Sequence, residues 1–157
     1  MPDSVTIFGG SVFQGCDALA EVTLNKNIKN ISRNMFQYCT SIESIEIPEG
    51  IEEISTNAFY GCSALKNIIL PESLKAIYSS AFAQCYKLEN IHIPKNVTTI
   101  DYSFVEECSA LTEITVVEEN SSFAAMNGAL YNKQKTSLMA YPLGKEETVL
   151  NIPSGVQ

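Results

Sequence analysis

The sequence predicts a repeat solenoid that is mainly β, with short helical or 3-10 turns and 23-residue coils whose strands run parallel. The first observation behind this prediction is the spacing of the cysteines, since all five in the chain lie 23 residues apart. The second is that apolar residues keep the same period: Phe precedes each of the first four cysteines by three residues, and Leu or Ile follows all five by three. Such self-similarity is typical of coils that bury their apolar side only against neighbouring coils. The cysteines are Cys16, Cys39, Cys62, Cys85 and Cys108.

Each coil begins with a segment that we interpret as a strand. Its pattern is Leu or Ile, two variable residues, and then alternating apolar positions that end in proline at 42–48, 65–71 and 88–94. Versions without proline occupy 19–25 and 111–117. Alternation of this kind predicts a strand with one buried face, and proline can close it because proline offers no N–H to a ladder.

A second apolar pair follows in every coil, as in Ile51 and Ile54, and predicts a short extended segment on another side of the coil. Next comes Ser-x-x-Ala-Phe-x-x-Cys or a close variant, for which we expect a tight helical turn with the aromatic ring directed inward. In the fifth coil Phe104 and Val105 replace the Ala-Phe pair. We expect local repacking there and no break in the solenoid.

The cysteines are predicted to form a ladder of buried, reduced thiols. Side chains at equivalent positions of stacked coils lie about 4.8 Å apart, whereas the Cβ atoms of a disulfide prefer about 3.8 Å. Buried thiols of this kind act as small apolar residues. Because no Cys-x-x-Cys or His-Cys spacing occurs, we predict no metal site, and nothing in the sequence indicates a cofactor.

Residues 118–151 depart from the period. Asn127-Gly128 is a turn signal, and 129–132 and 136–142 read as the two arms of a hairpin. Tyr131 and Tyr141 either pack on the neighbouring coil, which we favour, or form an exposed aromatic contact site.

We therefore divide the chain into three parts of one solenoid domain. Residues 1–117 hold five 23-residue coils, the first truncated; 118–151 form an irregular, hairpin-containing repeat; and 152–157 begin a further truncated repeat. Neither end shows a polar or atypical capping repeat, so we expect a fragment of a longer protein whose open coil ends associate end to end.

Charge and composition exclude several classes of function. With a net charge of −8 and only ten Lys and Arg, the chain lacks the basic face that nucleic acid or an anionic membrane requires. No apolar run approaches the roughly 20 residues of a membrane span, so we expect no membrane insertion. The only histidine, His92, matches Glu46 and Ile69 at an outward strand position, and no catalytic residue is predicted.

The pattern of Leu-x-x-Ile-x-Ile-Pro and small-residue-Phe-x-x-Cys at a period of 23 resembles the BspA-type leucine-rich repeat over about residues 1–117. This resemblance implies a right-handed leucine-rich-repeat solenoid and a cell-surface or secreted protein. It further implies adhesion to extracellular matrix or plasma proteins such as fibronectin and fibrinogen, or to other microbes. The chain departs from the common leucine-rich repeat where an asparagine ladder would stand, since these positions hold Asn27, Gly50, Ser73, Asn96 and Glu119.

The outward side chains of the predicted strands form the candidate binding face. Ile69 is the apolar residue among polar ones, and it is either the centre of a contact patch or an isolated exposed residue. We expect a non-enzymatic module that binds an extracellular protein, with a structural spacer that presents another domain as the alternative. The candidate residues are Glu21, Thr23, Ser44, Glu46, Asn67, Ile69, Asn90, His92, Glu113 and Thr115.

Overall fold

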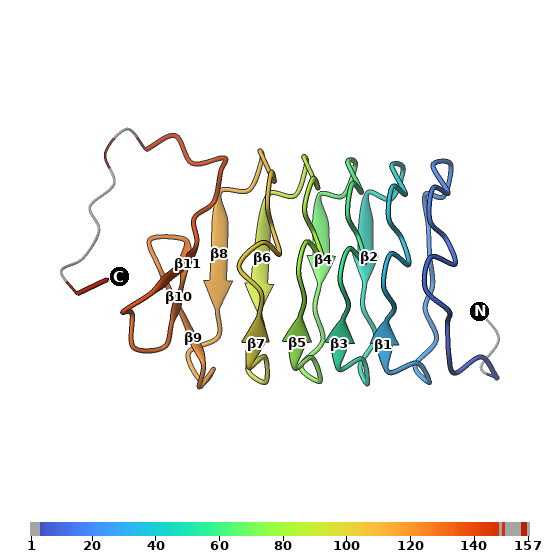
Figure 1. The fold of residues 1–157 in the computed structure, drawn as a ribbon, viewed down its shortest axis with the longest axis horizontal. Coiled ribbons are helices and arrows are strands. Elements are labelled where there is room, and N and C mark those ends of the chain that lie inside the picture. Colours follow the sequence, from blue (N-terminus) through green and yellow to red (C-terminus); the bar gives the residue numbers. More distant parts are fainter. Residues whose placement is uncertain (1–3, 148, 150–154, 157) are drawn as a thin grey trace.

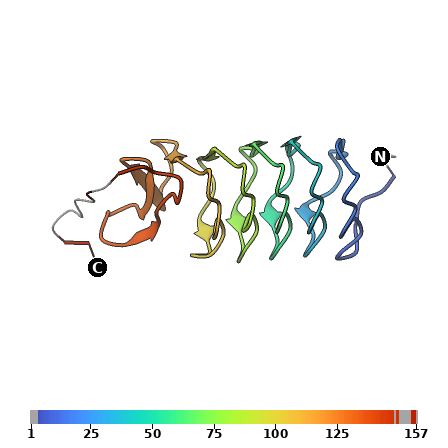
Figure 2. The same cartoon turned by 90° about the horizontal axis from the view of Figure 1, so that it is seen from above.

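The computed structural model describes residues 4–147, 149 and 155–156, in which successive coils stack along one axis as a β-solenoid (Figure 1). Seen from above, the coils follow one another in a row, and the hairpin-containing segment lies at the end opposite the N-terminus (Figure 2). The strand register confirms the 23-residue period, because Asn30 pairs with Glu53 and Glu53 pairs with Ala76.

Two sides of the coil carry parallel strands, as the sequence predicted. On one side, the second apolar pair of each coil ends in a strand of a four-stranded sheet ordered β1-β3-β5-β7. On the other side, β2 pairs with β4 and β6 pairs with β8. The first sheet consists of β1 (Asn30–Ile31), β3 (Glu53–Ile54), β5 (Ala76–Ile77) and β7 (Thr99–Ile100). The other side holds β2 (Ser44–Glu46), β4 (Asn67–Ile69), β6 (Asn90–Ile93) and β8 (Glu113–Val116).

The third side, which we call the turn side, differs from the expected helical turn. It keeps the i to i+3 hydrogen bonds of a 3-10 turn, such as Cys39 N to Phe36 O at 3.0 Å. However, Asn34 and Tyr38 have φ of 56° and 61°, and a left-handed residue at every fourth position stops a helix from forming. The intervening N–H groups point to the next coil instead, as from Phe36 N to Ala58 O at 2.8 Å.

The core is built from stacked identical positions. The rings of Phe13, Phe36, Phe59 and Phe82 follow one another with centroids 5.3 to 5.5 Å apart and nearly parallel planes. The expected repacking in the fifth coil is confirmed, since Phe104 is fully buried although it stands one place earlier in the repeat. The backbone continues unbroken there, with Phe82 N donating to Phe104 O at 2.8 Å.

Four of the five cysteines form the predicted ladder of buried free thiols. Each buried Sγ donates to a phenylalanine carbonyl oxygen of the preceding coil, at 3.0 to 3.3 Å. Cys16 is the exception, since it is exposed.

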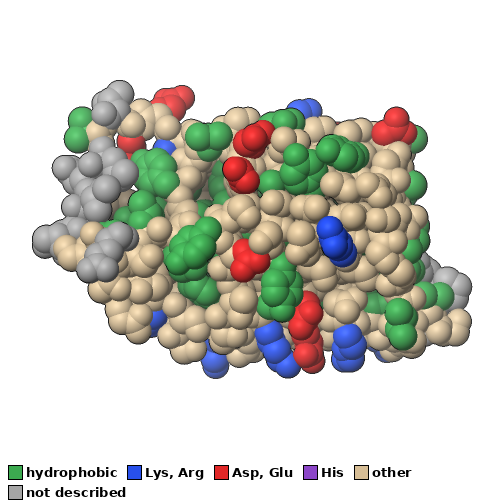
Figure 3. Space-filling model, in the orientation of Figure 1, with side chains coloured by type: hydrophobic (Ala, Val, Ile, Leu, Met, Phe, Trp, Pro, Cys, Tyr) green, Lys and Arg blue, Asp and Glu red, His purple; other side chains and the backbone are tan. Residues whose placement is uncertain are grey.

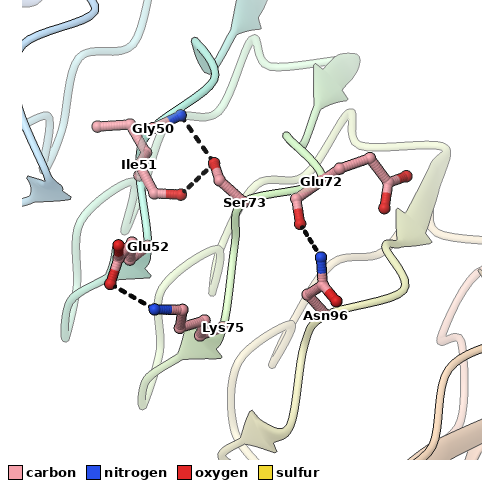
Figure 4. A network of polar contacts seen from close by, with 7 residues as sticks. All are labelled: Gly50, Ile51, Glu52, Glu72, Ser73, Lys75 and Asn96. Carbon is pink, nitrogen blue, oxygen red and sulfur yellow. Dashed lines mark hydrogen bonds and ion pairs between the residues drawn. The ribbon is translucent and has the colours of Figure 1, made fainter.

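One corner of the coil is held by polar bonds between successive coils (Figure 4). Ser73 Oγ accepts from Gly50 N and donates to Ile51 O, both at 2.8 Å, and Asn96 Nδ2 donates to Glu72 O at 2.8 Å. The interrupted asparagine ladder therefore still satisfies backbone groups, because serine takes over part of its role.

The irregular segment is a three-stranded antiparallel sheet ordered β11-β10-β9, from β9 (Phe123–Met126), β10 (Ala129–Asn132) and β11 (Leu138–Ala140). The predicted hairpin is β10 with β11, and the Asn127-Gly128 signal proves to be the two-residue turn of another hairpin that pairs β9 with β10. Both turn residues have positive φ, 50° and 73°, which suits the right-handed twist of a hairpin. The expected restart of the template at 152–157 lies outside the described residues, apart from 155–156.

Asn120 joins the regular coils to this sheet. It stands in register with Val97 and Leu74, at a core position, and is fully buried. Its Nδ2 donates to Pro94 O at 2.8 Å and Val97 O at 3.0 Å, while its Oδ1 accepts from the backbone N–H of the residues that open β9. A polar residue is tolerated in the core there because its side-chain amide is fully hydrogen-bonded.

Candidate functional site

Eight of the ten candidate residues lie on β2, β4, β6 and β8 and point away from the core. Alternation along each strand explains this arrangement, because the residue between two outward side chains is buried, as Ile45 and Ile91 are. All eight are exposed except Thr115, which is half-buried. They are Ser44, Glu46, Asn67, Ile69, Asn90, His92, Glu113 and Thr115, and we call them the strand face.

The strand register sets these side chains in two rows across the coils. In one row Ser44 stands beside Asn67, and in the other Glu46 stands beside Ile69. Farther along the second row, His92 Nδ1 lies 2.8 Å from Thr115 Oγ1, so the imidazole is hydrogen-bonded to the next coil. The expectation of an outward, solvent-facing His92 is confirmed.

Glu21 and Thr23 are exposed, but the structure does not align them with the strand face. Residues 19–25, expected as a strand, form none, and a hollow of about 490 Å³ separates them from β2. In this coil the proline position holds Asn25, whose Nδ2 donates to Val5 O at 2.9 Å. Without a backbone ladder to β2, nothing fixes this segment in the register of the other coils.

The strand face is acidic and bears one large apolar side chain. Ile69 is 62% exposed, between the positions of Glu46 and His92. An ion pair between Lys66 Nζ and Glu43 Oε2, at 2.9 Å, flanks the beginning of β4. The hydrogen bond and charge of Lys66 lower the pKa of the Glu43 carboxyl, so this pair is ionised at neutral pH.

The chemistry of this face is that of a contact surface. Its side chains supply hydrogen-bond donors, acceptors and one apolar centre, but no nucleophile beside a positioned base. Among residues 4–147, 149 and 155–156, no group of three or more His, Cys, Asp or Glu side chains is placed to hold a metal ion. Nor does that described part contain a helix of the length and apolarity needed to cross a membrane.

Sequence reasoning considered the strand side and overlooked the turn side. There, next to the irregular sheet, a hollow of about 400 Å³ lies between residues 102–107 and 139–143. Tyr102 and Tyr141 both line it, whereas Tyr131 is buried, so the preference for packing held for only one of the two hairpin tyrosines. The sequence feature that could have indicated this hollow was Tyr102, an aromatic residue at the position that Thr56 and Ser79 occupy in earlier coils.

A family model described as BspA type leucine-rich repeat region matches the chain in six copies, over residues 1–112 and 29–136. The chain belongs to this family. BspA-type repeats and their fold are typically non-enzymatic, and leucine-rich repeat proteins bind other proteins. A search of curated proteins gave no match.

Solved structures agree with this assignment. A leucine-rich cell surface protein from Faecalibacterium prausnitzii A2-165 is similar with a TM-score of 0.83 and 30% identity, covering 94% of this chain and 39% of that one. The pneumococcal vaccine antigen PcpA is similar with a TM-score of 0.79 and 32% identity, covering 83% and 32% of the two chains. A leucine-rich repeat protein of T. pallidum has a TM-score of 0.67 at 31% identity, with 70% and 51% covered. The BspA-type chain therefore spans between about a third and a half of these relatives.

Proposed function

We propose that this chain is a protein-interaction module of a cell-surface or secreted protein, and that it adheres to extracellular host or microbial proteins through the strand face. The observation that carries the proposal is the exposure of Ser44, Asn67 and Asn90, with Ile69 beside them, at one position of successive coils whose strands pair in parallel, β2 with β4 and β6 with β8. A rigid surface loses little conformational entropy on binding, so little of the free energy of its contacts is lost to ordering.

The composition of the face fits this role. Exposed polar groups can pair with a partner at the rim, while one apolar side chain supplies a centre from which water is excluded. Ile69 is the large apolar residue of the strand face, and its 62% exposure leaves it free to be covered. The location is supported by the similar proteins, of which one is described as a cell surface protein and another as a vaccine antigen.

The test is a binding titration against immobilised fibronectin and fibrinogen at physiological salt, using a triple variant in which Ser44, Asn67 and Asn90 become Lys. Three long cationic side chains placed across the face obstruct contact with a partner. We therefore expect affinity to fall at least about tenfold, which is the size of loss seen when important interface side chains are truncated. The fold should survive, because all three side chains are exposed.

A matched control carries the same added charge on the other sheet. Asn30, Thr98 and Thr99 are exposed on or beside β1 and β7, and their change to Lys should leave binding unaltered. Equal losses in both triple variants would indicate a general effect of charge, and equal affinity in the strand-face variant and the unmodified chain would contradict the proposed face.

A structural spacer is the second candidate function. It is favoured by the hydrogen-bonded stacking of every coil on the next, which stiffens the solenoid, and by the partial coverage of the longer relatives. In that case the full-length protein would bind through another domain, and the strand-face triple variant of the full-length protein would bind as strongly as the unmodified one.

A further inference from the structure

The hollow on the turn side is formed by two segments far apart in the sequence. One wall comes from the turn of the fifth coil, with Tyr102, Val105, Glu106 and Glu107. The other comes from β11 and the residues after it, including Tyr141 and Leu143. Figure 3 shows hydrophobic side chains and carboxylates close together on this face, where the irregular sheet meets the regular coils.

The walls present apolar surface to water. Tyr102 is 70% exposed and Leu143 is 64% exposed. An aromatic ring and an aliphatic side chain at the mouth of one hollow gain free energy when a partner covers them. Its volume of about 400 Å³ lies in the usual range of small ligand sites, roughly 300 to 1,000 Å³.

The charge of the hollow is negative. Glu106 and Glu107 are both exposed, and no Lys or Arg stands among the described residues that line it. The side chain of Glu107 accepts a hydrogen bond from Gln84 Nε2 at 3.0 Å, which orients that carboxylate. A ligand with positive charge is therefore complementary to this rim.

Lys145, a cation beside the hollow, is already paired with a carboxylate. Lys145 Nζ lies 5.8 Å from the centre of the Tyr141 ring and forms an ion pair with Glu147 at 2.8 Å. Tyr141 Oη donates to the same carboxylate at 3.0 Å, so the ring is held in place. This contact also shows that a tyrosine of the hollow accepts a cation over its face.

We propose that the hollow is a second binding site, separate from the strand face, that receives an arginine side chain of a partner protein with an apolar residue next to it. A guanidinium is planar, so it can stack on a tyrosine ring while its N–H groups pair with a carboxylate. The neighbouring apolar residue would cover Leu143. A neutral sugar could use the aromatic walls, but it would leave the two carboxylates without a countercharge.

The experiment is a nuclear magnetic resonance titration of the isotope-labelled chain with the peptide acetyl-Leu-Arg-Leu-amide. We expect saturable shifts of the amides at 102–107 and 139–143, with a Kd of about 1 mM, as suits one anchored side chain. The matched probe replaces Arg with citrulline, which keeps the planar shape and loses the charge. It should bind at least about tenfold more weakly, because the contacts with the carboxylates lose their charge.

Variants locate the site. Tyr102→Ala and Glu106→Gln should each weaken binding of the arginine peptide by about tenfold. Tyr86 is an exposed tyrosine of the turn side that does not line the hollow, so Tyr86→Ala should leave binding unchanged. Unchanged amide spectra away from the hollow would confirm that each variant is folded. Three results would overturn the proposal: no saturable shift at about 10 mM peptide, equal affinity for the citrulline peptide, or an equal loss in the Tyr86 variant.

Discussion

The cysteine ladder combines a packing role with a hydrogen-bonding role. Sequence alone indicated small apolar residues, but each buried thiol also donates to a carbonyl of the preceding coil. The turn side leaves that phenylalanine carbonyl with a free acceptor position, since its other bond is to the cysteine N–H of its own coil, as in Phe36 O with Cys39 N. Cysteine fits because its side chain is small enough for the core and still carries a weak donor.

Thiol labelling should separate Cys16 from the other four cysteines. Cys16 is exposed, whereas Cys39, Cys62, Cys85 and Cys108 are buried with no exposed surface. A thiol reagent added to the native protein should therefore modify one group rapidly, and the remainder only after unfolding. The variant Cys16→Ala should show no rapid phase, and a rapid phase larger than one thiol would contradict the buried ladder.

Burial also makes stability depend on alkaline pH. Desolvation raises the pKa of the Cys62 thiol from 9.0 to about 12. Below pH 9 the Cys62 thiol is protonated in both the folded and the unfolded state, so its full contribution to the free energy of unfolding is present. Between pH 9 and 12 the unfolded chain ionises while the folded chain holds its proton, so this group removes about 1.4 kcal/mol of stability per pH unit.

Denaturant titrations at several pH values from 8.5 upward can measure this slope. Cys62→Ala should make stability fall less steeply by about 1.4 kcal/mol per pH unit, although its stability at pH 8 is lower. The unmodified protein, titrated in parallel, is the reference for this slope. Parallel slopes for Cys62→Ala and the unmodified protein would contradict the raised pKa of the Cys62 thiol.

At the scale of an element, the turn side depends on residues that accept positive φ. Asn57, Ser80 and Gln84 take it despite their Cβ atoms, and Gly61 takes it with φ of 72°. Gly61 has a further reason to be glycine, because the Tyr38 ring of the preceding coil lies over it and forms an edge contact with Tyr60 at 5.5 Å between centroids.

Substitution of Gly61 by Ala should be more destabilising than the same change at Gly15. Both glycines have φ of 72°, so each change costs about 1 kcal/mol of backbone strain. A Cβ at Gly61 would lie 2.5 Å from Tyr38 Cδ1, whereas one at Gly15 meets nothing within 4 Å. We expect an additional cost of about 1 to 3 kcal/mol at Gly61, measured as the difference in unfolding free energy between the two variants.

The double variant Gly61→Ala with Tyr38→Ala provides the internal check. Removal of the ring takes away the clash, so the added Cβ should then cost no more than it does at Gly15. If Gly61→Ala and Gly15→Ala were equally destabilised, the close approach of Tyr38 would not be a determinant of stability.

At the scale of the whole molecule, stability is transmitted from coil to coil. The Phe stack, the Cys ladder and the backbone bonds each join one coil only to the next. A quasi-one-dimensional arrangement of this kind opens from its ends, because a terminal coil has a single neighbour to hold it.

Hydrogen exchange should follow this gradient along the solenoid. Amides around Cys62, which has coils on both sides, should exchange most slowly, and amides of the first coil, such as those at 11–16, most rapidly. Uniform protection along the described coils would contradict this expectation.

The chain also illustrates which features of such a fold are readable beforehand. The strand positions of Ser44 and Asn67, the buried rings and the thiol ladder follow from identical residues at a fixed spacing. The turn side was predicted in part: its i to i+3 hydrogen bonds are those of the expected 3-10 turns, but i to i+3 spacing fits a helix and a chain of reverse turns equally well, and only φ at residues such as Tyr38 separates them. Glu21 and Thr23 failed to align because a pattern indicates a strand without ensuring that its backbone reaches a partner.

The sequence by itself determined the period, the two parallel strand sides and the family, since every coil repeats the same local demands on burial and backbone. Tertiary structure alone decided the role of Asn120 and the hollow beside Tyr102. These features arise where a coil meets something other than another regular coil. There, which surfaces are buried and which remain open depends on contacts between distant segments, and a repeating pattern carries no information about them.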